Sequence, residues 1–170
     1  MNVIEQFCVG KFDDESLNED CIFVSDDYIA VIDGVTTKSD RRYNGMKSGK
    51  VASIILKKSF AEMPKQLSGK EVVQRLNKAI ETFAISCDPI ATGNEIPRAS
   101  IIFYSHFEHM IYSYGDCQCC LNGKVYQFEH QIDHMNSLLR KYVLELGIMD
   151  GMNLDEMIDK QYDRKVIQPF

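Results

Sequence analysis

The sequence predicts an α+β fold built on antiparallel sheets, because its candidate strands and helices occur in blocks. Candidate strands occupy the first 34 residues, two candidate helices follow, further strands lie between residues 99 and 128, and helices come last. A parallel doubly wound sheet would alternate strand and helix throughout. We therefore expect an antiparallel β-sandwich flanked by paired helices, formed by a single domain over residues 1–170.

The first strands follow from short apolar segments. A strand is predicted over residues 2–10, and a hairpin follows it. Residues 21–24 and 28–34 have the length and the β-branched and aromatic content of buried strands, and the triplet Ser25-Asp26-Asp27 is a short polar loop between them. Antiparallel pairing across this loop brings the start of one strand beside the end of the other.

Three carboxylates are expected at that end of the sheet: Glu19, Asp20 and Asp33. Like charges repel one another there unless a positive charge lies between them. A hard divalent cation such as Mg²⁺ or Mn²⁺ is the simplest explanation for the group. The alternative is that these acids are solvated loop residues, which is common for Asp beside Gly. The residues alone leave both interpretations open.

Two amphipathic helices are predicted next. Residues 45–61 place apolar side chains on one helical face. Ser68 and Glu71 have the spacing of a capping box, and apolar residues recur after them at intervals of three and four until Pro89 ends the pattern. Two such helices lying side by side can cover one face of a sheet.

Two further hairpins are predicted after the helices. Residues 99–104 and 109–114 are apolar segments separated by a polar turn. Residues 117–121 and 124–128 are joined by Asn122-Gly123, the strongest short hairpin signal in the chain.

Helices are predicted to end the chain. Apolar residues over 138–146 recur at helical spacing, and this helix is expected to end at Gly147. Asn153 has the position of an N-cap for a last short helix.

Composition and charge exclude some function classes. The chain has 170 residues, 45% of them hydrophobic, and a net charge of −6, which argues against nucleic acid or an anionic membrane as the main partner. The N-terminus lacks the basic start and long apolar segment of a signal peptide, and no segment approaches the roughly 20 apolar residues of a membrane span. We expect a cytoplasmic protein.

Six cysteines lie mostly in apolar segments, and we interpret them as reduced core residues. A zinc site is the alternative, because Cys117 and Cys120 have a C-x-x-C spacing and His130 and His134 follow. The two cysteines face opposite sides of a predicted strand, however, and no second cysteine pair completes a familiar zinc pattern. Core thiols are the favoured interpretation.

Three short motifs occur in an order that resembles a known family. They are Asn18-Glu19-Asp20 at the start of a strand, Ala30-Val31-Ile32-Asp33-Gly34 at the end of the next, and Ala99-Ser100 followed by Ser113-Tyr114-Gly115-Asp116. Together they resemble the PPM-type (type 2C) metal-dependent serine/threonine protein phosphatases over residues 18–123. The resemblance implies a β-sandwich flanked by paired helices, a bacterial-type hydrolase, and Mg²⁺ or Mn²⁺ as the cofactor.

The resemblance also implies roles for individual residues. Asp33 is expected to be the ligand that bridges two metals, and Gly34 to offer its backbone carbonyl. Glu19 is expected to serve the second metal directly or through water, and Asp20 to orient metal-bound water. Asp116 is expected beside a weaker third metal. The reaction implied is hydrolysis of phosphoserine or phosphothreonine by a water that bridges the metals.

The sequence departs from the family at the phosphate contact. Glu15 stands where the family has its phosphate-binding arginine. A glutamate carries a negative charge and would repel a phosphate. The phosphate-binding residue is therefore unknown, with Arg41, Arg42 or Lys11 as weak candidates from neighbouring loops. Val35 and the threonines after it stand where the family often has a general acid.

The late acidic motifs of the family are also missing. No Ser-Asp-Gly occurs, and Asp150-Gly151 is the nearest candidate. We therefore expect the chain to lack the C-terminal third of a phosphatase-like domain. The leading hypothesis is a phosphatase that acts on phosphorylated proteins, and the alternative is a catalytically inactive phosphatase-like module that binds a protein partner. The sequence predicts no oligomeric state.

Overall fold

The computed structural model describes most of the chain in two compact units. The described residues are 2–10, 17–35, 41–87, 96–127 and 131–167. The first unit spans Met1–Phe128 and the second Glu129–Phe170. The single domain over residues 1–170 stays a prediction.

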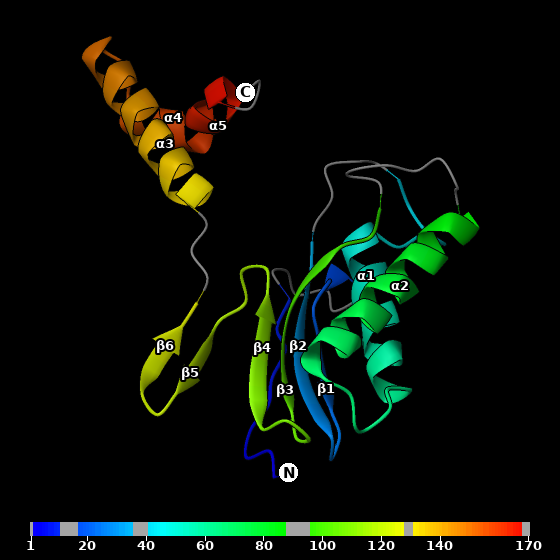
Figure 1. Ribbon diagram of the computed structural model, residues 1–170. Helices are drawn as coiled ribbons and strands as arrows, with labels where there is room; N and C mark the ends of the chain where they lie inside the picture. The colour runs from blue at the N-terminus through cyan, green and yellow to red at the C-terminus, as the bar shows by residue number, and fades with distance from the viewer. Residues whose placement is uncertain (1, 11–16, 36–40, 88–95, 128–130, 168–170) are drawn as a thin grey trace. The chain divides into compact units, whose positions relative to one another are not determined.

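The first unit contains a four-stranded antiparallel sheet in the order β1-β2-β3-β4 (Figure 1). A separate two-stranded antiparallel sheet, β5-β6, follows it in the chain. The strand bounds are Cys21–Val24 for β1, Tyr28–Gly34 for β2, Ala99–Ser105 for β3, Met110–Tyr114 for β4, Cys119–Leu121 for β5 and Lys124–Tyr126 for β6. The α+β class, its antiparallel pairing and all three predicted hairpins are confirmed.

The strand predicted over residues 2–10 is wrong, because those residues have no regular secondary structure. The side chains of Ile4, Phe7 and Val9 are all exposed. They fall on both faces of an extended chain, so pairing with a sheet could not bury them together on one face.

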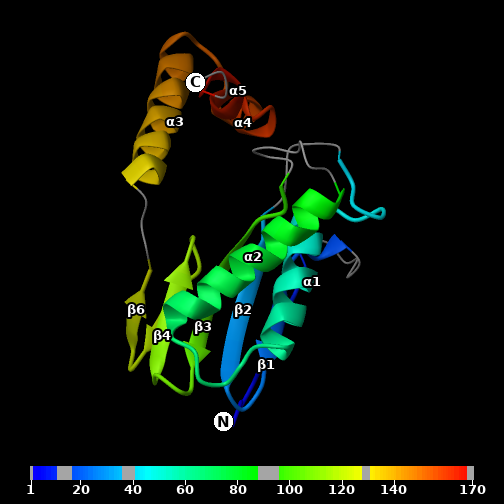
Figure 2. The same cartoon turned by 45° about the vertical axis from the view of Figure 1, so that its right-hand side comes forward.

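Two helices, α1 (Ser48–Ala61) and α2 (Gly69–Cys87), cover one face of the four-stranded sheet (Figure 2). The core between the helices and the sheet contains side chains from α1, from α2 and from the sheet. Its buried members are Tyr28, Ala30, Ile32, Leu56, Phe60, Val72, Leu76, Ile101 and Phe103. In β2, the buried residues alternate with more exposed ones, which is the pattern of a strand covered on one side.

The two helices begin for different reasons. The capping box before α2 is confirmed, since Ser68 N donates to Glu71 Oε2 at 2.9 Å and Glu71 N donates to Ser68 Oγ at 3.4 Å. Helix α1 begins three residues later than predicted. Tyr43 and Met46 exchange backbone hydrogen bonds of 2.9 and 3.0 Å in a tight turn, and Gly45 adopts a φ of 82° within it.

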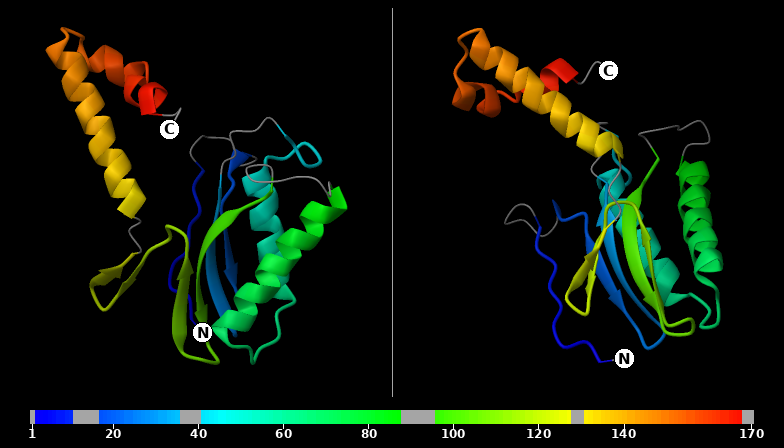
Figure 3. Two further views of the ribbon diagram at one scale, coloured as in Figure 1. Left: turned by 45° about the horizontal axis from the view of Figure 1, so that its top comes forward. Right: turned by 60° about the vertical axis from the view of Figure 1, so that its left-hand side comes forward.

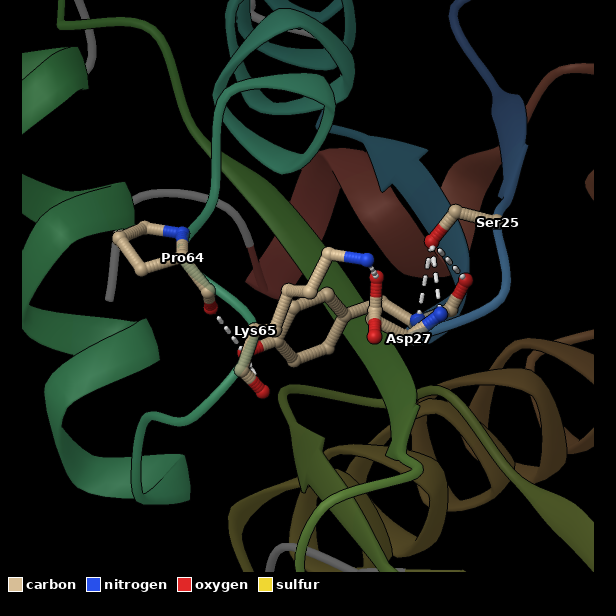
Figure 4. A network of polar contacts seen from close by, with 5 residues as sticks. Ser25, Asp27, Pro64 and Lys65 are labelled. Atoms are coloured by element: carbon tan, nitrogen blue, oxygen red, sulfur yellow. Dashed lines mark hydrogen bonds and ion pairs between the residues drawn. The ribbon is translucent and has the colours of Figure 1, made fainter.

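At the loop between β1 and β2, polar contacts join the sheet to the segment between the helices (Figure 4). The Tyr28 hydroxyl donates to the Pro64 carbonyl at 2.7 Å, and Lys65 Nζ lies 3.3 Å from Asp27 Oδ2. The Ser25 hydroxyl accepts from Tyr28 N at 3.0 Å and so closes the loop.

A second polar contact lies at the same end of the sheet. The Glu108 carboxylate accepts hydrogen bonds from Gly69 N at 2.6 Å and from the Tyr112 hydroxyl at 2.7 Å. The bond from Tyr112 raises the pKa of its own phenol, because the neighbouring carboxylate favours the protonated hydroxyl. This carboxylate therefore ties the start of α2 to β4.

The second unit consists of α3 (Gln131–Met149), α4 (Leu154–Asp159) and α5 (Tyr162–Ile167), and α4 and α5 pack against α3 (Figure 3). The predicted end of a helix at Gly147 is wrong, since α3 continues to Met149. A side chain at Gly147 would meet the end of Met157, so this glycine provides space for α4. The N-cap at Asn153 is confirmed, because its Oδ1 accepts from Glu156 N at 3.1 Å.

Among the helices that the structure describes, none has the length and apolar character needed to cross a membrane.

Candidate functional site

A cavity of about 550 Å³ lies at the end of the sheet where β2 finishes. It brings together all of the predicted metal and catalytic residues, which are Glu19, Asp20, Asp33, Gly34 and Asp116. Its described lining residues are Leu17, Asn18, Glu19, Asp20, Asp33, Gly34, Val35, Lys47, Ser100 and Asp116. The prediction that these acids share one end of the sheet is therefore confirmed, while their roles stay predictions.

Strand register places the acids at this end. Cys21 of β1 pairs with Ile32 of β2 at the end of their ladder. Asp20 and Asp33 are the next residues beyond this pair, one on each strand. Asp33 pairs in turn with Ser100 of β3. The cavity is thus formed where β1 and β3 begin and β2 ends.

A buried asparagine fixes the acidic segment before β1. The Asn18 side chain is only 6% exposed, and its Oδ1 accepts a hydrogen bond of 3.0 Å from Asp20 N. Its amide nitrogen donates to Cys8 Sγ at 3.3 Å. One carboxylate oxygen of Glu19 is also buried from solvent. These contacts hold the two acids in an ordered turn and not in a freely solvated loop.

Two glycines bring α1 against the end of β2. A Cβ built on Gly49 would lie 2.8 Å from the backbone carbon and oxygen of Gly34, and a Cβ on Gly34 would collide with the carbonyls of Gly49 and Glu19. Backbone atoms cannot move aside as a flexible side chain can. Only glycine at both positions allows this approach, which sets the start of α1 beside the cavity.

A third glycine places Asp116. Gly115 has a φ of 91°, and a side chain there would meet Ser100. The next residue, Asp116, has its backbone N 3.5 Å from Ser100 Oγ. The turn after β4 therefore returns the chain to the start of β3 and brings this carboxylate to the cavity.

Cys117 is a neighbour of the acids that the sequence reasoning missed. Burial, together with repulsion of the thiolate by Asp33, Asp116 and Asp20, raises the pKa of its thiol from an ordinary 9.0 to about 11. Three carboxylates from three segments thus act on one sulfur. Its position directly after Asp116 was the available signal.

The donors in the cavity fit one kind of cation site. Within the part of the chain that the structure describes, no three His, Cys, Asp or Glu side chains converge closely enough to hold a metal ion. Mg²⁺, however, keeps several waters and usually binds through one or two carboxylates together with substrate phosphates. The carboxylates here are the oxygen donors that such a hydrated ion prefers.

The arginines considered for phosphate lie elsewhere. The Arg41 guanidinium stacks 5.1 Å from the centroid of the Tyr43 ring, and Arg42 Nη1 donates to the Arg41 carbonyl at 3.1 Å. Neither arginine lines the cavity. Glu15 and Lys11 lie outside the described residues. The basic residue that the cavity does contain among its described lining residues is Lys47, which the sequence reasoning did not single out.

The expectation that the cysteines are core residues is wrong. Cys87 and Cys120 are exposed, and the other four are partly buried. Cys87 ends α2, and Cys120 lies in the short β5-β6 hairpin, so neither has a covering layer. All six are free thiols in the structure. His130, part of the zinc alternative, lies outside the described residues.

Comparisons with protein-family models, with curated proteins and with solved structures found no match to this chain. The resemblance to the PPM-type phosphatases therefore depends on the motifs and on what the cavity brings together. The function drawn from it is a proposal.

Proposed function

We propose that this protein is a Mg²⁺- or Mn²⁺-dependent phosphatase that hydrolyses phosphoserine or phosphothreonine in proteins. One observation carries the proposal. The acids that the motif resemblance singles out come from three separate segments and line one cavity; they are Glu19, Asp20, Asp33 and Asp116. Like charges gathered in one place repel each other, and a bound cation offsets that cost.

The proposal extends to the fold. An antiparallel sheet with α1 and α2 on one face supports a PPM-type sandwich, in which a second sheet covers the other face. On that other face, Val31 and Ile111 are 44% and 39% exposed. Apolar residues at these positions suit a covered surface better than a solvated one.

The residues have distinct tasks in this mechanism. A bound Mg²⁺ or Mn²⁺ neutralises phosphoryl charge and lowers the pKa of water. Asp33, at the end of a rigid strand, would hold the cation in place. Asp20, fixed by its bond to Asn18, would orient the attacking water along the line of displacement. The contact between Gly34 and Gly49 holds the start of α1 beside the end of β2, where these acids lie.

The test compares Asp33→Ala with Asp26→Ala, a matched loss of one exposed acid from the loop at the other end of the β1-β2 hairpin. Mn²⁺-dependent hydrolysis of a phosphothreonine peptide and of p-nitrophenyl phosphate is measured, with circular dichroism as the check on folding. Asp33→Ala should lower the rate by more than the roughly 10–100-fold typical of outer-shell changes. Asp26→Ala should retain the full rate.

The result also decides between this function and the alternative of an inactive module that binds a protein partner. If the folded protein binds Mn²⁺ but shows no turnover that depends on Asp33, the enzyme proposal fails. The partner-binding module is then the better account, because a carboxylate site can hold a cation without catalysing hydrolysis.

A further inference from the structure

Lys47 is the basic side chain among the described residues that line the acidic cavity. It occupies the N-cap position of α1, with extended backbone angles of φ −69° and ψ 155°. Its side chain makes no capping hydrogen bond there. Lysine is a poor N-cap residue, since a cap must accept hydrogen bonds and an ammonium group only donates them. Capping therefore does not explain this residue.

The backbone of Lys47 is held firmly. Its carbonyl accepts the first helical bond of α1 from Val51 N at 3.1 Å. Two residues later, Gly49 packs against the backbone of Gly34. The position of Lys47 at the cavity is thus fixed by the same contact that joins α1 to β2, and its side chain is only partly exposed.

Structural ion pairing does not account for its charge either. The ion pairs of the described residues use other lysines, namely Lys58, Lys65, Lys141 and Lys160. Each of those lies on an exposed surface, where a pair contributes about 0–1 kcal/mol. Lys47 instead lines a cavity together with four carboxylates.

A phosphate ester entering this cavity needs positive charge from the protein. Cations held by the carboxylates supply part of it, but a phosphate dianion has three terminal oxygens, and a metal cannot contact all of them. Lysine is a common phosphate ligand that acts as a point charge. We propose that Lys47 binds the substrate phosphate. It would take over the task of the family's phosphate-binding arginine, whose position is occupied by Glu15 in this chain. This inference rests on the proposed phosphatase function.

The proposal makes opposite predictions for the two ligands of the site. Lys47→Gln removes a positive charge, so inorganic phosphate should bind at least about 10-fold more weakly in the presence of Mn²⁺, given the strength of charged hydrogen bonds. Mn²⁺ itself should bind as tightly or more tightly, since one repelling charge is gone. If the role of Lys47 were purely structural, the substitution would weaken the binding of phosphate and of Mn²⁺ together.

Three variants test this. Lys47→Gln is compared with Lys47→Arg, which keeps the charge, and with Lys58→Gln, which removes an exposed charge from the same helix. Binding of inorganic phosphate and of Mn²⁺ is measured by calorimetry, and KM and kcat are measured with a phosphothreonine peptide. Lys47→Gln should raise KM more than it lowers kcat, Lys47→Arg should restore phosphate binding, and Lys58→Gln should behave as the unsubstituted protein does.

Failure of this proposal can be separated from failure of the function. If Lys47→Gln binds phosphate as tightly as the unsubstituted protein, or if that protein with Mn²⁺ binds no phosphate, Lys47 is not the phosphate ligand. Hydrolysis that still depends on Asp33 would then leave the phosphatase function intact. Conversely, phosphate binding that depends on Lys47 without any hydrolysis supports the ligand assignment and overturns only the enzyme.

Discussion

The two ends of the four-stranded sheet use acidic residues in opposite ways. At the end that carries the β1-β2 loop, two acids have defined partners. Asp27 pairs with Lys65 at 3.3 Å, and Glu108 accepts hydrogen bonds from Gly69 N and the Tyr112 hydroxyl. These acids connect the sheet to the segment that joins α1 and α2, and to the start of α2.

At the other end, four carboxylates line one cavity together with Lys47. The Cys117 thiol, whose pKa is raised to about 11, lies within the electrostatic influence of three of them. Acids that stabilise a fold are paired with donors, whereas like charges that gather in one place repel one another. The first end therefore serves stability, and the proposed cation site lies at the second.

The largest effect is expected from the contact that builds the cavity end. Gly34→Ala places a Cβ against the backbone of Gly49 and Glu19, so the strand end and α1 must separate. Overpacking costs about 1–3 kcal/mol and occasionally more in the free energy of unfolding, and contact with backbone atoms puts this variant at the upper end of that range. Urea denaturation measures it, and Mn²⁺ binding should be lost as well.

Gly123→Ala is the control, because its Cβ would meet no atom within 4 Å although its φ is 77°. Strain from that φ alone costs about 1–2 kcal/mol. If Gly34→Ala is no more destabilising than Gly123→Ala and keeps Mn²⁺ binding, the close approach of α1 to β2 is not what forms the cavity.

A smaller loss is expected at the loop end. Glu108→Ala leaves the Gly69 N–H and the Tyr112 hydroxyl without their acceptor, which should cost about 1–3 kcal/mol of unfolding free energy. Glu108→Gln, which keeps an acceptor oxygen, should cost less. Equal stability of Glu108→Ala and the unsubstituted protein in urea denaturation would show that this acid is not structural.

The smallest effect has the opposite sign. Asp116→Asn removes one of four like charges from the cavity end, so without divalent cations it should raise the free energy of unfolding, by less than about 1 kcal/mol at this exposed position. Adding Mn²⁺ should reverse the order, since the unsubstituted protein gains more from binding. A loss of stability in EDTA would mean that Asp116 has a structural partner.

Local signals in the sequence were enough for much of the fold. The β1-β2 hairpin has its predicted bounds, and the capping box at Ser68 and Glu71 forms as expected. These features depend on residues a few positions apart, where alternation, turn residues and caps are decisive. Placing Glu19, Asp20 and Asp33 at one end also followed from a single short hairpin.

Contacts between distant segments could not be predicted in the same way. Lys47 reaches the cavity because Gly34 and Gly49 are in contact, and the local sequence around neither glycine indicates that contact. Gly147 resembles a helix end, yet it lies inside α3, where its lack of a side chain leaves room for Met157. Residues 2–10 have the composition of a strand but lack its alternation, and composition outweighed pattern in that prediction.

The central claim is that the acidic end of the sheet binds a divalent cation through Asp33. Calorimetric titration of Mn²⁺ into the protein, Asp33→Asn and Asp26→Asn tests it most directly, because it needs no substrate. We predict binding to the protein and to Asp26→Asn, and its loss in folded Asp33→Asn. Equal Mn²⁺ binding by all three proteins, or by none of them, would contradict the claim.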